Sequence, residues 1–311
     1  MAVMIKTVNL TKRYGTLVAL SNLNLEIHEG DCFGFIGPNG AGKSTTIKIL
    51  ATLLQPTWGE ARVCDYVVGY QSRQIRPLIG YVPDYFGAYE DMVVQEYLDF
   101  FAAAYNIHGS ARTKIVNDVL ELTDLAYKRD APVDGLSRGM KQRLSIARVL
   151  VHDPKVLLLD EPAGNLDPRA RIEMRELLKE LQRMGKTILI SSHILPELQD
   201  LCNKVGIIEQ GELIYSGPWT DIVKRARTGT MLHVGVAHNQ QMAAALLSQD
   251  PNIENVTANN GYLEVSVKTG VEDYRFVPQR LIQNGFKLTM LKEEEVNLET
   301  AFMRLTKGMV Q

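Results

Sequence analysis

Cysteine, net charge and long apolar runs are all scarce in this sequence of 311 residues. The three cysteines, Cys32, Cys64 and Cys202, are odd in number and far apart, which excludes a disulfide framework and a zinc-ligand pattern and favours a reducing compartment. The net charge of -2 gives no electrostatic reason to bind nucleic acid or an anionic membrane. Apolar runs such as Val156–Leu159 are too short to span a bilayer, so work at a membrane requires another chain.

The composition is that of a globular protein, with 45% hydrophobic and 23% charged residues, and the length suggests about two domains. Cys32–Ile36, Val156–Leu159 and Thr187–Ile190 are apolar enough to be buried strands. Predicted helices over 44–54 and 169–184 alternate with them, short strands are expected within 3–36, and residues 90–152 have helical periodicity. This alternation predicts an α/β fold with a mainly parallel sheet and a helical insert.

A glycine-rich turn joins the strand Cys32–Ile36 to a helix that begins near Lys43. Gly37, Gly42, Lys43 and Ser44 have the spacing of a phosphate-binding loop. Glycines let successive backbone N–H groups point at one anion, and the helix N-terminus adds its positive dipole end. Lys43 supplies a charge for the outer phosphates, and the Ser44 hydroxyl is a ligand for Mg²⁺. The alternative is a glycine-rich turn that binds nothing.

Polar side chains directly follow the other two apolar strands. Asp160 and Glu161 follow one strand and His193 follows the next, so they converge on the phosphate loop if the strands are parallel. With Ser44, Asp160 fits a Mg²⁺ site. Glu161 is placed to polarise a water that attacks the terminal phosphate, and His193 is a candidate sensor of that phosphate. The alternatives are a solvated acidic turn and a structural histidine.

Two further features have two interpretations each. The segment Leu136–Arg143 opens a helix with Ser137 near its cap. It is either an ordinary capped helix or a second phosphate site formed by backbone N–H groups. Tyr14 is either an aromatic residue at a strand end or a platform for a nucleobase.

Residues 223–311 begin a new pattern of strand, helix, strand, strand, helix, strand. Its marks are alternation in Leu232–Val236, a turn at Asn260–Gly261, a helix over 272–284 and a terminal helical face at 298–305. This order is typical of a small α+β ferredoxin-like domain. Because it contains no phosphate loop, paired acids or metal-ligand spacing, we expect a regulatory or association domain.

Over about residues 3–220, these features resemble the ATP-binding subunit of an ABC transporter. The motifs that carry the resemblance are, in chain order, a Walker A loop at Gly37–Ser44, a signature at Leu136–Met140, a Walker B strand at Val156–Pro162, a D-loop at Asn165–Asp167 and a switch histidine at His193. The resemblance implies a P-loop NTPase fold with a RecA-like parallel sheet core, an antiparallel β subdomain and a helical subdomain. It also implies ATP as the nucleotide and Mg²⁺ as its cofactor.

The family's mechanism pairs two such domains head to tail, with ATP between the loop of one and Ser137 and Gly139 of the other. By the same resemblance, Glu161 is the general base, His193 senses phosphate and Lys43 contacts phosphate. The residues expected to contact ATP are Tyr14, where the family stacks adenine, and Gly37, Pro38, Asn39, Gly40, Ala41, Gly42, Lys43, Ser44, Thr45, Ser137 and Gly139.

The sequence departs from the family pattern at two places. The signature usually contains Ser-Gly-Gly-Gln, whereas residues 137–140 are Ser-Arg-Gly-Met. The strand Ile79–Pro83 leads in the family to a glutamine that touches Mg²⁺ and links the site to the membrane subunit, whereas this chain has Asp84. A carboxylate is an acceptable but shorter Mg²⁺ ligand, so Ser44, Asp84 and Asp160 are the expected metal ligands. We expect hydrolysis to survive with altered coupling or metal dependence.

The prediction is an ATP-binding and ATP-hydrolysing subunit that powers a membrane ABC transporter. Asn297–Thr306 resembles the C-terminal motif of ABC-2-type exporter ATPases, which favours an exporter. The expected domains are an ABC ATP-binding domain at 1–222, with a helical subdomain at about 85–152, and a regulatory or association domain at 223–311. The expected partners are a separate transmembrane permease subunit and a second ATP-binding subunit, either the same chain or a relative, with no nucleic acid. The expected location is cytoplasmic, on the inner face of the cell membrane through the permease.

Two other functions stay open. A soluble ABC-type ATPase acting on nucleic acid or the ribosome would carry a long coiled coil or two cassettes, and the sequence has no heptad stretch between Lys43 and Ser137 and only one cassette. A regulatory module that binds ATP without hydrolysing it is the other, with Asp84 in its favour and Glu161 and His193 against it.

Overall fold

The computed structural model describes residues 2–85, 87, 91–226, 230–259, 261–268, 270–271 and 273–293, with the backbone alone at 223–226. Within these ranges the chain divides into two compact units, residues 2–219 and 220–293. The expected border between residues 222 and 223 lies three residues from that division. The extent of the helical subdomain and the roles of the two domains stay predictions.

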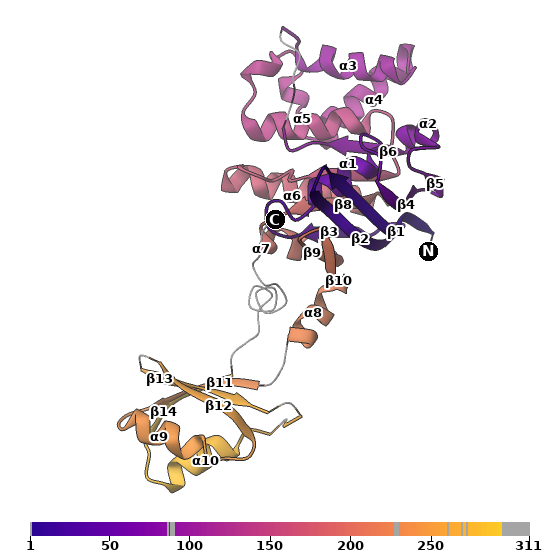
Figure 1. Cartoon of the computed structure of the whole chain (residues 1–311). Helices are drawn as coiled ribbons and strands as arrows, with labels where there is room; N and C mark the ends of the chain where they lie inside the picture. The colour runs from indigo at the N-terminus through magenta and orange to yellow at the C-terminus, as the bar shows by residue number, and fades with distance from the viewer. Residues whose placement is uncertain are drawn as a thin grey trace. The chain divides into compact units, whose positions relative to one another are not determined.

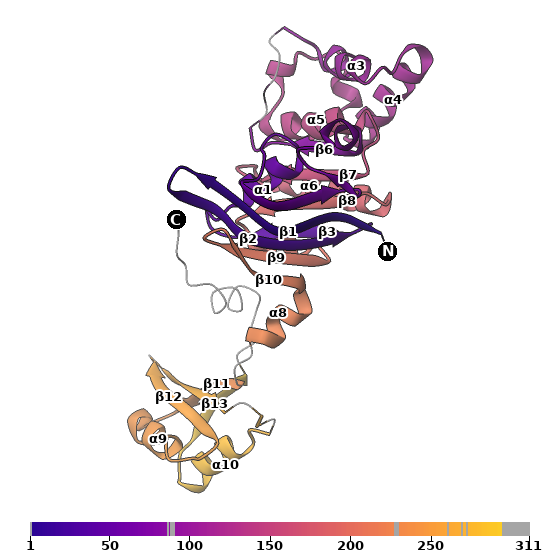
Figure 2. The same ribbon diagram turned by 45° about the vertical axis from the view of Figure 1, so that its right-hand side comes forward.

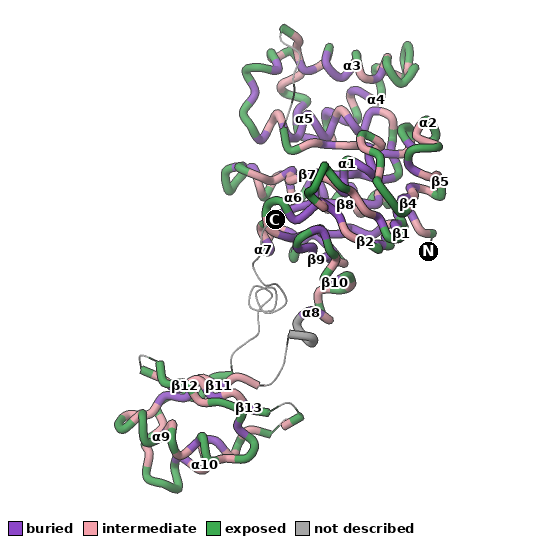
Figure 3. Tube along the Cα trace, viewed as in Figure 1, coloured by how far each residue is buried: buried purple, intermediate pink, exposed green. Residues whose placement is uncertain are grey.

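A six-stranded sheet forms the centre of the first unit, in the order β10-β9-β3-β8-β7-β6 (Figure 1). Its strands are β3 (Cys32–Ile36), β6 (Ile79–Val82), β7 (Val156–Asp160), β8 (Thr187–Ser192), β9 (Lys204–Glu209) and β10 (Glu212–Pro218). All pairings are parallel except that of β10 with β9, which confirms the mainly parallel sheet. β3, β7 and β8 are buried along their whole lengths, as parallel strands covered on both faces must be (Figure 3).

An antiparallel sheet in the order β2-β1-β4-β5 lies beside α1 (Figure 2). Its strands are β1 (Val3–Tyr14), β2 (Leu17–His28), β4 (Trp58–Val63) and β5 (Tyr66–Val67), and α1 is Lys43–Leu50. The expectation of short strands within 3–36 is wrong for β1 and β2, which have 12 residues each. They continue past polar residues because register shifts and the positive φ angles of Asn9 and Asn22, 48° and 49°, absorb the irregularities. One core of buried side chains joins this sheet, α1 and the main sheet.

The other helices of this unit are α2 (Ser72–Ile75), α3 (Val94–Ala104), α4 (Gly109–Leu122), α5 (Arg138–Leu150), α6 (Pro168–Arg183) and α7 (Leu195–Gln199). α8 (Trp219–Ala226) begins at the division between the two units. Short 3₁₀ turns cover Arg76–Leu78, Ala126–Lys128 and Val133–Gly135. The expected helical insert corresponds to α3, α4 and α5, which pack on one another (Figure 1). The helix expected to reach Leu54 ends at Leu50, because Thr52 has a φ of 62° that no right-handed helix accommodates. None of the described helices has both the length and the apolar character needed to cross a bilayer.

The second unit is a four-stranded antiparallel sheet in the order β12-β13-β11-β14 with two helices. Its elements are β11 (Thr230–Val236), α9 (Gln240–Leu247), β12 (Ile253–Asn259), β13 (Tyr262–Val267), α10 (Phe276–Gln283) and β14 (Leu288–Glu293). This confirms the ferredoxin-like order, and side chains from both helices and the sheet share one core. The expectation of a helix from residue 272 is wrong, because the Asp273 carboxylate accepts from the Arg275 backbone N–H in a turn ahead of α10. Asn260 and the terminal face 298–305 lie outside the described residues.

Candidate functional site

The glycine-rich loop connects the end of β3, inside the main sheet, to the start of α1. A Cβ atom added at Gly37 would lie 2.1 Å from the backbone oxygen of Ile208, so only glycine fits against β9. Gly42 has a φ of 108°, and a Cβ there would lie 2.7 Å from the oxygen of Ala19. The loop is therefore held between β9 and β2, and neighbouring backbone atoms leave room only for glycine at both of its ends.

The remaining loop residues lie where the phosphate-loop pattern predicts. The Ala41 N–H donates to the Pro38 carbonyl at 3.2 Å, which closes the loop, and Gly211 donates to the Ala41 carbonyl at 3.0 Å. Gly40 has a φ of 81°, and Asn39 and Gly40 are exposed. Ser44 and Thr45 are the second and third residues of α1. The loop thus stands open to solvent at the N-terminus of a helix, an arrangement that attracts anions.

Lys43 is buried beside the loop. Its Nζ donates to the carbonyl oxygens of Gly37 at 2.6 Å and Pro38 at 3.0 Å, and lies 3.8 Å from Glu161 Oε1. Burial lowers the pKa of Lys43, and the charges of Glu161 and Asp160 oppose that shift. The ammonium group is thus directed at the loop and lies beside the carboxylates that end β7.

Asp160 joins three elements through one carboxylate oxygen. Its Oδ1 accepts a hydrogen bond from Ser44 Oγ at 3.0 Å and another from Ser191 Oγ at 2.7 Å. Asp160 and Ser191 are register partners in β7 and β8, so the parallel pairing places them side by side. The structure therefore brings together two of the three predicted metal ligands, Ser44 and Asp160, both with hard oxygen donors that suit Mg²⁺.

Glu161 and His193 also meet. Glu161 has a φ of 49°, which is uncommon for a non-glycine residue and typical of positions constrained by function. Its backbone N–H donates to Ser191 Oγ at 3.0 Å, and its Oε2 lies 2.9 Å from His193 Nδ1. The left-handed turn points this carboxylate back toward the phosphate loop and the end of β8.

Ser191 is the site residue that sequence reasoning missed. It is fully buried, and its hydroxyl donates to the Asp160 carboxylate while accepting from the Glu161 N–H. Two residues of the candidate machinery thus depend on one side chain of a neighbouring strand. The sequence offers one signal for it: Ser191 directly follows an apolar run and precedes His193 by two residues.

Four predicted site residues are not brought to the loop. Tyr14 is exposed at the end of β1, with Lys12 Nζ 5.1 Å from its ring centroid. Ser137 caps α5 by accepting from the Met140 N–H at 3.3 Å, and Gly139 packs on α6. Asp84 is exposed after β6. Among the described residues, no hydrogen bond joins any of these four to the loop.

Asp84 nevertheless lies within electrostatic range of Tyr81 in β6, which the charge of Asp160 also reaches. The pKa of Tyr81 is raised to about 12 by burial first, and then by the charges of Asp160 and Asp84. In the described part of the chain, no group of three or more His, Cys, Asp or Glu side chains is arranged to hold a metal ion. Mg²⁺ bound beside phosphates usually keeps few protein ligands.

Comparison with known proteins gives consistent matches. The family described as ABC transporter matches residues 20–164. The linearmycin resistance ATP-binding protein LnrL of Bacillus subtilis is 31% identical over 97% of this chain and 98% of its own. The bacitracin transport ATP-binding protein BcrA of Bacillus licheniformis is 34% identical over 99% of both chains. The Nod factor export ATP-binding protein I of Burkholderia orbicola is 42% identical over 67% of this chain and 69% of its own.

Solved structures match about 70% of the chain. The ATP binding subunit of an ABC transporter superposes with a TM-score of 0.65 at 27% identity, covering 71% of this chain and 92% of the other. A dimeric ATP-binding cassette in a post-hydrolysis state, bound to ADP and Pi, gives a TM-score of 0.63 at 28% identity, covering 69% and 98%. The two relatives that match over nearly their whole length, a resistance and a transport ATP-binding protein, together with these folds, show the family.

Proposed function

The chain belongs to the ABC transporter family as the ATP-binding and ATP-hydrolysing subunit of an exporter, and we propose how its residues divide that work. The observation that carries the proposal is the meeting of the phosphate loop with two strand ends. Ser44 Oγ lies 3.0 Å from Asp160 Oδ1, and His193 Nδ1 lies 2.9 Å from Glu161 Oε2. Phosphate, metal and water therefore have their candidate partners within one small region.

For ATP binding, we assign the phosphates to the loop N–H groups and to Lys43, which exchanges its two carbonyl partners for phosphate oxygens. Ser44 and Asp160 fit Mg²⁺, which when bound neutralises charge on the phosphates. Exposure of Tyr14 leaves its ring available for stacking on adenine. Asp84 is the third proposed metal ligand, reached directly or through water.

For hydrolysis, Glu161 accepts a proton from the water whose oxygen attacks the terminal phosphorus. The bond from that phosphorus to the bridging oxygen breaks, which yields ADP and phosphate. His193 contacts the same carboxylate and so orients it, and its other ring nitrogen is available to the terminal phosphate. Ser191 holds the backbone of Glu161 and the carboxylate of Asp160 in register.

The site is completed by a second ATP-binding subunit, either the same chain or a relative. Ser137 is exposed at the N-cap of α5, where helix N–H groups and the dipole favour an anion. No described contact ties it to its own loop, which supports a role toward the ATP of the partner. A dimeric cassette among the solved relatives supports the same arrangement.

The sharpest test replaces Glu161 with Gln. We expect the Glu161→Gln chain to bind ATP with little change, to lose ATP turnover by about 100-fold or more, and to accumulate as a dimer with ATP. Glu176→Gln on α6, at an exposed glutamate, is the matched control and should turn over normally. Normal hydrolysis by Glu161→Gln would remove Glu161 as the general base. The measurements are phosphate release and size-exclusion chromatography.

A groove beside β6 is our proposed contact for the membrane permease subunit. It has a volume of about 260 Å³, and its wall combines apolar and aromatic side chains with two arginines. The apolar and aromatic side chains include Leu53, Ile79, Phe101 and Tyr105. Tyr105 stacks on His152 with ring centroids 3.9 Å apart, which makes one wall rigid. Because β6 leads to Asp84, a segment of the permease in this groove would be linked to the nucleotide site. We therefore propose that the chain, when bound to the permease, lies on the cytoplasmic face of the membrane.

The groove is tested by a charge at its exposed rim. Leu53→Asp should abolish copurification of the permease subunit while leaving ATP turnover of the isolated chain unchanged. Leu17→Asp, at a comparably exposed leucine on β2, is the control, since the two leucines are 58% and 50% exposed. Retention of the permease by Leu53→Asp would place the contact elsewhere.

A further inference from the structure

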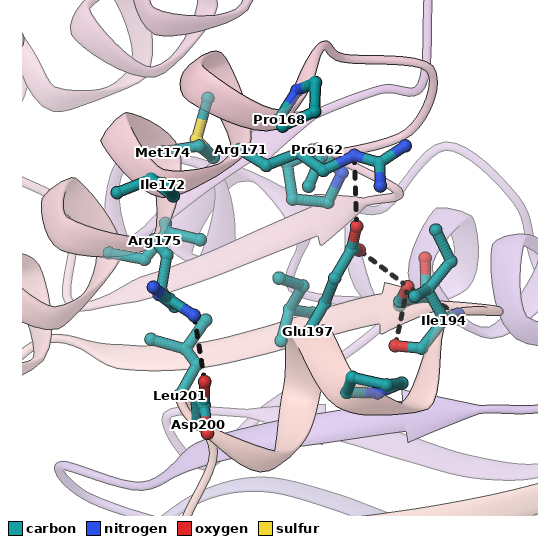
Figure 4. Close-up of a pocket in the computed structure, with 16 residues that line it drawn as sticks. Pro162, Pro168, Arg171, Ile172, Met174, Arg175, Ile194, Glu197, Asp200 and Leu201 are labelled. Atoms are coloured by element: carbon teal, nitrogen blue, oxygen red, sulfur yellow. Dashed lines mark hydrogen bonds and ion pairs between the residues drawn. The ribbon is translucent and has the colours of Figure 1, made fainter.

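A second cavity lies behind the strand ends that carry Glu161 and His193. It is enclosed by α6, α7 and the end of β8, and its volume is about 540 Å³ (Figure 4). Most of its wall is apolar, from Ile172, Met174, Leu178, Ile190, Ile194 and Leu201. It is separate from the glycine-rich loop, since no loop residue lines it. Its volume is in the range of small-molecule sites.

The polar part of the wall has unmet hydrogen-bonding capacity. Arg171 Nε, Arg175 Nε and Glu197 Oε1 are buried and make no hydrogen bond, although each lies within ion-pair distance of an opposite charge. Arg171 Nε and Glu197 Oε1 form an ion pair at 3.5 Å, and the Arg175 guanidinium binds Asp200 through Nη1 at 2.9 Å (Figure 4). Buried polar atoms without hydrogen bonds are costly, so a group that supplied the bonds would be favoured.

The charged side chains of the cavity wall indicate which class of ligand it could bind. Two arginines face two carboxylates, so the lining is neutral overall and a charged ligand would have to displace an existing ion pair. A hydroxyl both donates to Glu197 and accepts from an arginine Nε, and an amide can do the same. We propose that this cavity binds an uncharged, mainly apolar small molecule that carries a hydroxyl or amide group.

Such a ligand would act on ATP turnover, a step that rests on the proposed roles of Glu161 and His193. Pro162 and Ile194, the residues that follow them in sequence, both line the cavity. Glu197 Oε2 also accepts from Ser192 Oγ at 3.3 Å, and that hydroxyl accepts from the Ile194 N–H at 2.9 Å. A molecule that engages Glu197 therefore contacts the turn that carries the switch histidine.

The test uses 1-octanol as the probe and octanoate as its charged counterpart, with binding to the full chain followed by saturation-transfer NMR. Met174→Trp fills the cavity from within, and Ile172→Trp fills it from the rim, where the 53% exposed side chain spares the fold. Met184→Trp, just after α6 and also 53% exposed, is the matched control. Thermal unfolding checks that each variant is folded.

We expect saturable binding of 1-octanol that weakens by about tenfold in the two cavity variants, is unchanged in Met184→Trp, and exceeds that of octanoate. Absence of saturable binding, equal binding by all variants, or preference for octanoate would overturn the proposal. ATP turnover is measured with and without probe. A change of about twofold or more, lost in the cavity variants, supports the link to His193. Binding without any change in turnover would overturn the link alone, and the probe-free rate tests the proposed function separately.

Discussion

Replacing Ser191 with Ala removes a hydroxyl that makes two hydrogen bonds, to the Asp160 carboxylate at 2.7 Å and from the Glu161 N–H at 3.0 Å. The side chain is completely buried, so water cannot replace these bonds without a rearrangement. A hydrogen bond to a charged group contributes about 1.5–3 kcal/mol, and the backbone N–H adds about 1 kcal/mol. Together these predict a loss of about 2.5–4 kcal/mol in the free energy of unfolding. For a unit of this size that corresponds to a fall of roughly 5–16 °C in Tm.

The effect of Ser191→Ala on turnover should exceed its effect on nucleotide affinity. The loop keeps its glycines and Lys43, whereas the N–H of Glu161 loses its shorter hydrogen bond and keeps only the one to the Ser191 carbonyl at 3.2 Å. We therefore expect ATP turnover to fall by about 10–100-fold. The assays are thermal unfolding, nucleotide binding and phosphate release. Thr123→Val is the control, since Thr123 is 1% exposed and donates to the Val119 carbonyl far from the site. It should lose stability but not activity. Wild-type turnover in a folded Ser191→Ala chain would refute the positioning argument.

Three other changes give separate tests. Gly37→Ala should abolish ATP binding and destabilise the chain by about 1–3 kcal/mol, because the added methyl group would overlap a backbone carbonyl of β9. Gly135→Ala is the control, since a Cβ atom there would have no neighbour within 4 Å. It should be neutral in unfolding and binding assays. Asp84→Gln should keep hydrolysis and change its Mg²⁺ dependence or its coupling to transport; an unchanged Mg²⁺ titration and unchanged transport would contradict this. Burial raises the pKa of Asp31, but hydrogen bonds from Lys204 and Asn203 outweigh it and lower the pKa below 3.8. The interactions of the Asp31 carboxylate therefore stabilise the fold above the pKa that Asp31 has in the unfolded chain. This stabilisation is lost as the pH falls through the lower pKa of Asp31 in the folded chain. Asp31→Asn should be less stable than wild type at pH 7 and equal to it at the acid end of a pH series of unfolding curves.

The parts of the fold that follow from continuous apolar patterns could be predicted. Val156–Leu159 is apolar at every position and Thr187–Ile190 at every position but the first, a pattern typical of strands buried on both faces. Once those strands are parallel, the residues after them must share one edge of the sheet. The meeting of Asp160, Glu161 and His193 with the loop is therefore a consequence of topology rather than of any local motif.

Other features depended on information that a pattern does not carry. The length of β1 and β2 depends on Asn9 and Asn22 adopting positive φ angles, whereas their polarity suggests strand ends. Ser191 looks like any serine after an apolar run, and only its register with Asp160 reveals its two hydrogen bonds. Ser137 illustrates a third reason: its proposed partner is the ATP of another subunit, so no property of one chain displays the contact.

The signature segment departs from the family pattern at Arg138 and Met140, where larger side chains have room, and keeps glycine at position 139, where they do not. A Cβ atom added at Gly139 would lie 2.7 Å from Ala170 Cβ on α6, so the glycine permits close approach of α5 and α6. Arg138 is exposed and Met140 is only partly buried, so larger side chains at those positions do not enter that contact. α6 begins at the cap formed by Asp167, whose Oδ1 accepts from the Ala170 N–H at 3.0 Å. That cap follows Glu161 by only six residues. The close contact at Gly139 therefore connects the segment proposed to serve the partner's ATP to the turn that carries this chain's own proposed general base.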